Sequence, residues 1–215
     1  MKTLEVAQRS EHWFNARRGM PTASRFKSIL TPAQGKPSSA QDTLINELLA
    51  ESLLPPTEGI IRRPMTAEME HGVIYEAEAR CSYDLEHAKA PVKEVGFVIH
   101  ESGLFGGSPD CLVGEFGGCE IKCPGGEDSK LPGAKHIGFI RENVLPDEYK
   151  CQIHGYLVIT GRAFWDLFVY SRNLPPFLFT VKPDDFTKKL EAELFKFCER
   201  YNAERAKFGL KPIGT

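Results

Sequence analysis

Apolar residues recur at intervals of three or four along four stretches of the chain, and this spacing predicts helices. The stretches are residues 44–53, 66–87, 147–159 and 183–206. Two shorter helices are expected near the N-terminus, the first capped by Ser10 and the second by Thr22 or Ser24. Pro55 and Pro56 end the first long helix, because proline lacks the amide hydrogen that a helix needs.

Between residues 95 and 123, and again after residue 162, the pattern changes to short β-prone runs separated by turns. The expected strands are 96–99, 111–113, 119–121, 163–170 and 177–181. We expect the first three to form an antiparallel meander. Because no internal repeat and no long linker interrupt the chain, the pattern predicts a single α/β domain with a central mixed β-sheet flanked by helices.

One carboxylate lies on a helix face that should be buried. In the helix predicted for residues 66–87, four residues follow one face at helical period: Met69, Val73, Ala77 and Arg80. Glu76 falls on the same face. A carboxylate there is paired with a cation, coordinates a metal ion, or lies at the edge of the apolar stripe, which is the commonest of the three.

Composition excludes several classes of protein. With 215 residues, 41% of them hydrophobic, the chain can bury a core without disulfide bonds. It has no run of about 18 apolar residues and no signal-like N-terminus, so we expect neither a membrane span nor export. The six cysteines form no C-x-x-C pair, which argues against a zinc or iron–sulfur site and favours a reduced, cytoplasmic protein.

Charge is unevenly distributed, although its sum is close to zero. The formal net charge of −2 would by itself argue against a partner as anionic as nucleic acid. However, residues 66–128 hold 4 basic and 13 acidic side chains, whereas residues 1–65 hold 9 and 6 and residues 129–215 hold 14 and 10. An acidic centre between basic flanks is compatible with a metal site beside an anionic substrate.

The most informative chemistry lies at Asp110, Glu120 and Lys122. Alternate residues of a strand point to the same side, so Glu120 and Lys122 project together while Ile121 faces the core. Asp110, at the end of the preceding hairpin arm, is expected beside them. Two carboxylates suit Mg²⁺, and a lysine there would orient a water or stabilise developing charge, although such a pair on a strand is often a solvated ion pair.

Four segments occur in the order found in one known family. Pro109-Asp110 followed by Glu120-Ile121-Lys122 resembles the PD-(D/E)xK nuclease motif, and its extension to Pro124 resembles that of the lambda-type phage exonuclease (YqaJ) family. Residues 13–24 resemble the family's W-x-x-x-R-x-G-x-x-T-A-S element. Residues 72–76 resemble its G-x-x-x-E helix, and residues 152–156 the Q-x-x-x-Y helix of RecB-like nucleases. The resemblance implies the restriction-endonuclease-like fold of the PD-(D/E)xK superfamily.

This resemblance implies a Mg²⁺-dependent 5′-to-3′ exonuclease that degrades one strand of linear double-stranded DNA from 5′-phosphorylated ends. The 3′ overhangs would serve a single-strand annealing protein in phage-type recombination. The enzyme would be a ring-shaped homotrimer, encoded by a phage or prophage, in the bacterial cytoplasm. Within a single nuclease domain, residues 10–54 would contribute to the DNA-end site, residues 66–182 would form the catalytic core, and residues 183–206 the C-terminal helix.

The resemblance also assigns metal ligands. Asp110, Glu120 and the backbone carbonyl of Ile121 would bind Mg²⁺, and Glu76 would complete the acidic cluster by holding a second ion, with Mn²⁺ as a candidate substitute. Lys122 would position the attacking water.

Helix residues would support these ligands. Gln152 would orient Lys122 or the phosphate; without the resemblance it would be interpreted as an ordinary exposed helix residue. Tyr156 and His154 are candidates for positions behind the ligands. A helix turns by about 200° over two residues, so at most one of Gln152 and His154 points into the site.

A separate set would recognise the DNA end. Arg17, Ser24 and Ser108 match the family positions that bind the terminal 5′-phosphate, and a guanidinium with two hydroxyls suits that anion. The alternatives are a surface arginine, a helix cap and a turn serine. Met69 occupies the place of the apolar residue that wedges apart the terminal base pairs, although its helical spacing alone is that of a core residue.

Two other functions stay open. One is a related PD-(D/E)xK endonuclease or an exonuclease of opposite polarity, and the other is a catalytically silent DNA-binding recombination scaffold. The loop at residues 31–39 resembles a family segment that contacts duplex DNA with a basic residue, but Lys36 is its only cation and Gln34 falls where the family has an arginine. The resemblance therefore does not predict how this loop would grip duplex DNA.

Overall fold

The structure is a computed structural model that describes residues 1–55, 67–125 and 133–214, without the side chains of residues 67–69. Its helices are α1 (Glu11–Arg17), the 3₁₀ helix η1 (Ala23–Ser28), α2 (Gln41–Leu53), α4 (Ala67–Glu86), α5 (Ala134–Glu142), α6 (Asp147–Thr160) and α7 (Asp185–Lys207). Its strands are β1 (Lys2–Leu4), β2 (Val92–Lys93), β3 (Phe97–Ile99), β4 (Gly106–Gly107), β5 (Cys111–Val113), β6 (Gly117–Lys122), β7 (Phe164–Val169) and β8 (Phe177–Val181). Every helix predicted from apolar spacing is present, whereas α5 was not predicted.

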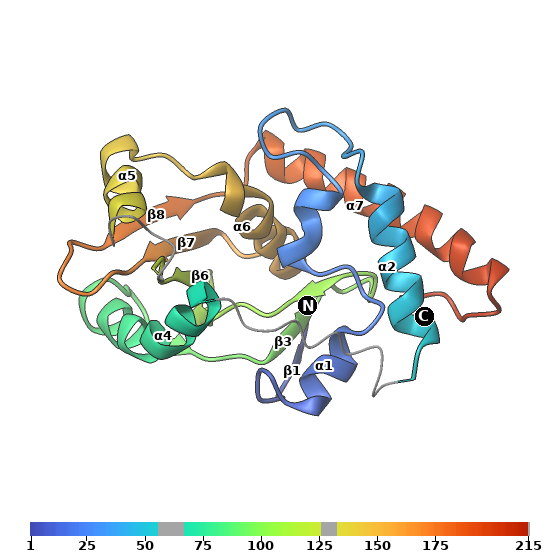
Figure 1. The fold of residues 1–215 in the computed structure, drawn as a ribbon, viewed down its shortest axis with the longest axis horizontal. Coiled ribbons are helices and arrows are strands. Elements are labelled where there is room, and N and C mark those ends of the chain that lie inside the picture. The colour runs from blue at the N-terminus through green and yellow to red at the C-terminus, as the bar shows by residue number, and fades with distance from the viewer. Residues whose placement is uncertain (56–66, 126–132, 215) are drawn as a thin grey trace.

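A five-stranded sheet lies at the centre, in the order β2-β5-β6-β7-β8 (Figure 1). Strands β6 and β7 run parallel and the other neighbouring pairs run antiparallel, so the predicted mixed sheet is confirmed. A parallel pair needs a long crossover connection. Here the crossover contains α5 and α6, and it brings α6 against β7.

The predicted meander of three strands is wrong in one respect. The β5–β6 hairpin is antiparallel as expected, but β3 belongs to a separate three-stranded sheet of order β1-β3-β4. The reason is that both edges of β3 are already occupied, one by the N-terminal strand and the other by the two glycines of β4.

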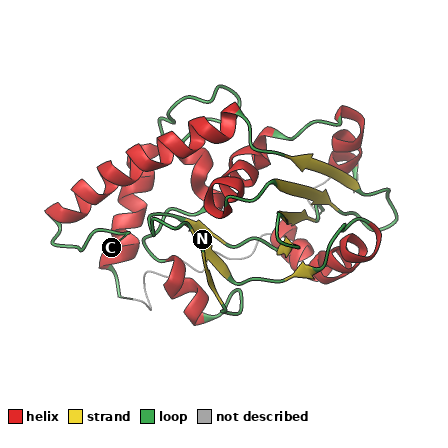
Figure 2. Cartoon of the chain, turned by 180° about the vertical axis from the view of Figure 1, so that it is seen from behind, coloured by secondary structure: helices red, strands yellow, loops and turns green. Residues whose placement is uncertain are grey.

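Helices cover both faces of the central sheet (Figure 1). The larger core cluster joins α2, η1, α6 and α7 to one face, and it includes Trp165 and Leu167 of β7. The smaller cluster joins α4 to the other face, and it includes Ile121 of β6. Figure 2 shows the long α7 lying across α6 and α2, which it contacts.

The buried face of α4 differs from the predicted one. Val73 and Ala77 are exposed, whereas Ala79 and Tyr83 are buried. Tyr83 donates a hydrogen bond from its hydroxyl to Asp166 of β7 (2.6 Å), which fixes the helix on the sheet by a polar contact that apolar spacing does not reveal. Glu76, one helical turn before Ala79 and Arg80, lies at the edge of this face.

The N-terminal helices follow the predicted order of helix, turn and helix. Ser10 caps α1 and accepts a hydrogen bond from the amide of Trp13 (3.2 Å). Thr22 precedes η1, although its side chain makes no capping bond. The turn requires Gly19, which has φ +64° and where a Cβ would lie 2.1 Å from Ser52 Oγ.

Two further observations concern the cysteines and the lengths of the helices. All six cysteines are free and four of them are buried, but Cys81 is exposed. Among the described residues, no helix is long and apolar enough to cross a membrane.

Candidate active site

The β5–β6 hairpin brings the predicted acidic residues together. Asp110 immediately precedes β5, and its Oδ2 accepts a hydrogen bond from the backbone amide of Ile121 in β6 (2.6 Å). Glu120 and Lys122 project together from β6, and Lys122 Nζ donates to Glu120 Oε1 (2.5 Å). Ile121 points the other way and packs in the core cluster of α4, as strand alternation predicts.

Glu120 has one oxygen without a partner. The residue is 3% exposed, and its Oε1 accepts hydrogen bonds from both Lys122 and Gln152 Nε2 (2.6 Å for the latter). Its Oε2 is buried and has no hydrogen-bond partner among the residues that the structure describes. Burying a carboxylate oxygen in this way is costly unless a cation or a donor meets it. An oxygen ligand from Glu120 beside the carboxylate of Asp110 is the donor type that Mg²⁺ prefers, so these residues fit a divalent cation.

The pKa shifts at the site reflect the same excess of negative charge. Burial raises the pKa of Asp110 well above its usual value, and repulsion from Glu120 raises it further. Burial alone would lower the pKa of Lys122, but the attraction of Glu120 and Asp110 outweighs that effect and raises it. Lys122 is therefore charged at neutral pH, and a bound cation would relieve the repulsion between the carboxylates.

A chain of hydrogen bonds runs from Glu120 along α6. Gln152 Nε2 donates to Glu120 Oε1 and to the hydroxyl of Tyr156 (3.0 Å), and that hydroxyl donates to the backbone carbonyl of Ser108 (3.0 Å). Tyr156 is buried and stacks on Trp165 with ring centroids 4.8 Å apart. Gln152 thus contacts Glu120, where the prediction was a contact with Lys122 or the phosphate.

The prediction that His154 lies behind the metal ligands is wrong. Its Nδ1 is 2.8 Å from Thr187 Oγ1 and 3.6 Å from Asp184 Oδ1, so it faces the start of α7. The side chain of Gln152 points toward Glu120, and the rotation of the helix over two residues turns His154 away from the site.

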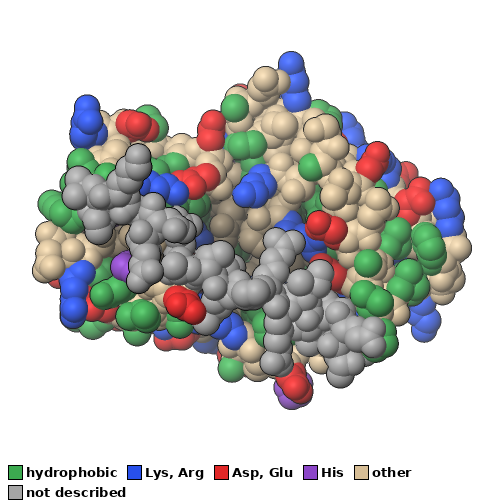
Figure 3. All heavy atoms as spheres, viewed as in Figure 1, with side chains coloured by type: hydrophobic (Ala, Val, Ile, Leu, Met, Phe, Trp, Pro, Cys, Tyr) green, Lys and Arg blue, Asp and Glu red, His purple; other side chains and the backbone are tan. Residues whose placement is uncertain are grey.

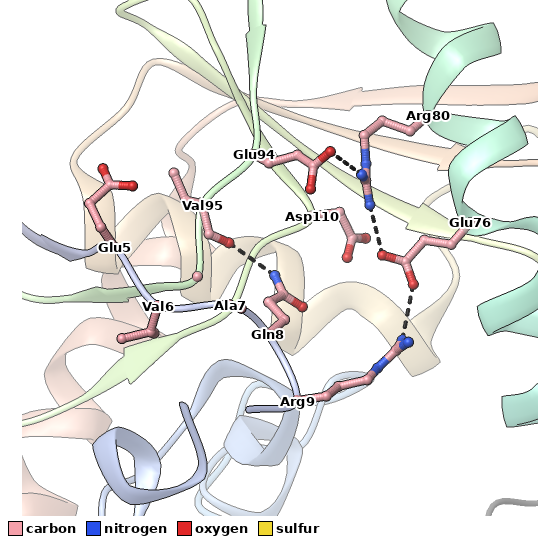
Figure 4. A pocket seen from close by; sticks show the side chains of 11 residues that line it. Glu5, Val6, Ala7, Gln8, Arg9, Glu76, Arg80, Glu94, Val95 and Asp110 are labelled. Atoms are coloured by element: carbon pink, nitrogen blue, oxygen red, sulfur yellow. Dashed lines mark hydrogen bonds and ion pairs between the residues drawn. The ribbon is translucent and has the colours of Figure 1, made fainter. Parts of the chain in front are cut away.

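Glu76 is paired with two arginines and does not form one cluster of ligands with Asp110 and Glu120. Arg80 Nη2 donates to its Oε1 (2.9 Å) and Arg9 Nη2 to its Oε2 (3.0 Å), and Arg80 is also ion-paired with Glu94. Figure 4 shows the two arginines approaching Glu76 from different sides, with Asp110 on the wall of the same cavity, which has a volume of about 480 Å³. In the described parts of the chain, no three His, Cys, Asp or Glu side chains are close enough to hold a metal ion.

Two of the three predicted phosphate-binding residues meet. Arg17 Nη1 donates to Ser108 Oγ (3.3 Å), and the guanidinium of Arg17 lies over the ring of Trp13, 3.9 Å from its centroid. Ser24 is exposed on η1, 3.5 Å from Thr22 Oγ1, and within the described chain it makes no hydrogen bond with Arg17 or Ser108. The predicted contact with a terminal phosphate stays a prediction for all three.

For Met69 and for the loop at residues 31–39, the structure gives a position in the chain but does not test the predicted contact with DNA. Met69 belongs to α4, but its side chain lies outside the described residues, so the wedge stays a prediction. Gln34 and Lys36 are exposed in the loop before α2. Figure 3 shows that the face around the central hollow carries both basic and acidic side chains, not one uniformly basic surface.

Sequence reasoning placed Arg80 on the face of Glu76 without assigning it as the partner, and it missed the contacts of Trp13 and Arg9. Arg80 follows Glu76 by four residues, a spacing that predicts an ion pair on a helix. Trp13 lies in the matched N-terminal segment, but nothing in its spacing indicates that its ring lies under Arg17. Arg9 is 67 positions from Glu76 in the chain and has φ +67°, and no local pattern signals either property.

The sheet order, the flanking helices and the acidic hairpin define the PD-(D/E)xK fold class, which the resemblance implied. The profile of the YqaJ-like viral recombinase domain matches residues 12–163, and the chain belongs to this family.

Solved structures support the same assignment. The alkaline exonuclease LHK-Exo of Laribacter hongkongensis is similar, with 31% sequence identity, TM-score 0.76 and coverage of 93% of this chain and 96% of that one. Its complex with dAMP has 30% identity, TM-score 0.71 and coverage of 93% and 98%. A phage-related exonuclease from Haemophilus somnus 129PT shares the fold, with 13% identity, TM-score 0.59 and coverage of 91% and 99%. Among curated proteins, no significant match is found.

Proposed function

We propose that the protein is a divalent-metal-dependent exonuclease that degrades the 5′-ended strand of linear double-stranded DNA. The observation that carries the proposal is the buried oxygen of Glu120, which has no partner in the described chain and lies beside Asp110 and Lys122 on one hairpin. Membership of the YqaJ-like viral recombinase family and the similarity to LHK-Exo, which is named an alkaline exonuclease, support the nuclease activity. The dAMP in the related complex supports a nucleotide ligand.

Asp110 and Glu120 would hold the cation, with the backbone carbonyl of Ile121 as a further ligand and Glu76 available for a second ion. A bound Mg²⁺ supplies a Lewis acid that polarises the scissile phosphate and lowers the pKa of a water. Lys122, charged and held by Glu120, would position the attacking water and offset the negative charge that develops on the phosphate. Gln152 would keep the Glu120 carboxylate in one orientation, because it binds the same oxygen as Lys122.

The proposed polarity depends on Arg17 and Ser108. Their contact places a cation and a hydroxyl together, and Tyr156 connects the backbone of Ser108 to Gln152 and so to Glu120. A terminal 5′-phosphate bound there would lie at a defined separation from the carboxylates. Hydrolysis would then release nucleotides successively from that end and leave a 3′ single strand.

The proposal extends to the setting in which the enzyme works. A 3′ single strand is the substrate of a single-strand annealing protein, and a ring-shaped homotrimer would keep duplex DNA enclosed during repeated hydrolysis. A phage or prophage gene and the cytoplasm of a bacterial host fit that role, as does Mg²⁺ with Mn²⁺ as a substitute. These statements rest on family membership.

The test is digestion of linear duplex DNA carrying a label at the 5′ or the 3′ end, with Mg²⁺ or with chelator. The wild type should release nucleotides from 5′-phosphorylated ends only when Mg²⁺ is present. Lys122→Ala should be nearly inactive, whereas Lys93→Ala, a change of the same type at an exposed strand residue, should behave as the wild type. Equal digestion by Lys122→Ala, or no release by the wild type, would contradict the proposal.

The same assay separates the alternative functions. Cutting of covalently closed circular duplex would indicate an endonuclease, and earlier loss of the 3′ label would indicate the opposite polarity. Binding of DNA without hydrolysis in any divalent cation would indicate a silent recombination scaffold.

A further inference from the structure

We propose that Trp13 is a positioning residue for recognition of the DNA end. Its ring face holds the Arg17 guanidinium in place. Its N–H group donates to the Ser108 hydroxyl, which also accepts from Arg17 and so can meet an anion only as a donor. The inference rests on the proposed function, in which Arg17 and Ser108 contact a terminal 5′-phosphate.

The indole of Trp13 contacts both of these residues. Its Nε1 donates to Ser108 Oγ (2.8 Å) and to the backbone carbonyl of Gly96 (3.1 Å). The ring face lies 3.9 Å from the guanidinium carbon of Arg17, the geometry of a cation–π contact. Trp13 therefore fixes the relative positions of a cation from α1 and a hydroxyl that lies 91 residues further along the chain than Arg17.

The hydroxyl of Ser108 has a defined hydrogen-bonding state. A serine hydroxyl has one hydrogen to donate and two lone pairs that accept. Both lone pairs of Ser108 Oγ face N–H donors, one from Trp13 and one from Arg17 at 3.3 Å. In the described part of the protein no acceptor receives the hydrogen of this hydroxyl, so the remaining valence of Ser108 suits an anionic oxygen.

The side chain of Arg17 can also donate hydrogen bonds to an anionic oxygen. Its contact with Ser108 is the one hydrogen bond that its side chain makes within the described chain, which leaves most of the five N–H groups of the guanidinium available. Burial lowers the pKa of Arg17, which shows that the guanidinium is partly removed from water without a full counter-charge. A phosphate would supply that charge, and the ring of Trp13 would keep the guanidinium fork from rotating away.

The position of α1 itself depends on the same side chain. No residue of α1 is fully buried, so the helix has little apolar anchorage of its own. The indole hydrogen bonds to Gly96 and Ser108 tie the helix to the segments that precede β3 and β5. Truncation of Trp13 to alanine would thus move the helix as well as the phosphate-binding groups, and a more conservative change is needed.

Trp13→Phe is the sharpest variant, because phenylalanine keeps an aromatic face for Arg17 and removes the N–H donor. We expect kcat/KM for 5′-phosphorylated duplex ends to fall roughly tenfold or more, the size expected for a weakened hydrogen bond to a charged group. The value for 5′-hydroxyl ends should stay within about twofold. Trp13→Leu, which also removes the ring face, should lower the value for phosphorylated ends further.

Two additional measurements separate positioning from folding. Ser108→Ala should lose the same preference, and the double variant with Trp13→Phe should lose little more than Ser108→Ala alone, because both changes remove one interaction. In chelator, without hydrolysis, the wild type should bind 5′-phosphorylated duplex more tightly than 5′-hydroxyl duplex, and Trp13→Phe should reduce that difference. His12→Ala, on the exposed side of the same helix, should change neither quantity.

The outcomes are distinct. If the wild type prefers phosphorylated ends and Trp13→Phe keeps the full preference, the role of Trp13 is wrong while the proposed function stands. A wild type that digests DNA without any preference for phosphorylated ends would overturn the proposed end recognition, and the inference on Trp13 with it.

Discussion

Glu120 and Glu76 are two carboxylates near Asp110 whose surroundings differ. Glu120 lies on a strand, is almost fully buried and keeps one oxygen without a partner in the parts of the chain that are described. Glu76 lies on a helix, has a side chain that is 24% exposed, and has an arginine on each oxygen. For the proposed cation, the strand carboxylate already offers a free oxygen, whereas the helix carboxylate would first have to exchange an arginine.

The cost of that exchange is small at Glu76. Arg9, whose side chain is 54% exposed, makes a single ion pair with it, and exposed pairs of this type contribute about 0.2–1 kcal/mol. Arg80 is more firmly held, because it bridges Glu76 and Glu94. Release of Arg9 alone would free one oxygen of Glu76 toward the cavity that Asp110 also lines.

The largest effect should come from Glu120→Gln, which keeps the shape of the side chain and removes its charge. We expect kcat to fall about a thousandfold or more, because the cation that polarises the phosphate loses a charged ligand. Steady-state digestion of 5′-phosphorylated duplex over a range of Mg²⁺ concentrations measures it. Glu115→Gln, on the exposed turn of the same hairpin, is the matched control and should be unaffected. Activity within tenfold of the wild type would remove Glu120 from the metal site.

Glu76→Gln should have a smaller effect of a different type. We expect the Mg²⁺ concentration at half-maximal rate to rise by roughly tenfold, with a smaller fall in kcat than for Glu120→Gln, if Glu76 holds a second ion after Arg9 leaves. Titration of the rate with Mg²⁺ measures both quantities. If the two variants have the same profile, the contrast between strand and helix carboxylates has no functional meaning.

Tyr156→Phe tests the connection between the Glu120 side of the site and Ser108. Removal of the hydroxyl leaves the carbonyl of Ser108 and the amide of Gln152 each with one partner fewer, at a cost of about 1–3 kcal/mol in the free energy of unfolding. We expect activity on phosphorylated ends to fall about fivefold to tenfold. Chemical denaturation and the end-preference assay measure the two effects. A loss of stability with unchanged activity would show that Tyr156 has a structural role alone.

The sheet, the hairpin and most helices were predictable because their signals are local. Strand alternation placed Glu120 and Lys122 on one side and Ile121 on the other, and apolar spacing located α6 and α7. Apolar spacing predicted that Val73 and Ala77 would be buried, but both are exposed. The orientation of α4 also depends on the hydrogen bond from Tyr83 to Asp166, which apolar spacing does not reveal.

The rest of the site comes from contacts between distant parts of the chain. Arg9 reaches Glu76 across 67 positions, and Trp13 reaches Ser108 across 95. Helix α5 was missed because its buried residues are few, namely His136 and Phe139, and because its N-cap, Gly133, has a left-handed conformation. Such features depend on the folded chain as a whole.

Arg9→Gln should have the smallest effect, and in the opposite direction to Glu76→Gln. Removing the exposed partner leaves one oxygen of Glu76 free, so the protein should bind Mn²⁺ more tightly in the absence of DNA, by up to about fivefold. Calorimetric titration of the protein with Mn²⁺ measures this change. Lys93→Gln removes the same charge from an exposed pair with Glu5, another residue that lines the cavity, and should alter the affinity less. Equal effects of the two variants would mean that only the total charge matters. Weaker binding by Arg9→Gln would mean that Arg9 orients Glu76 for the cation instead of competing with it.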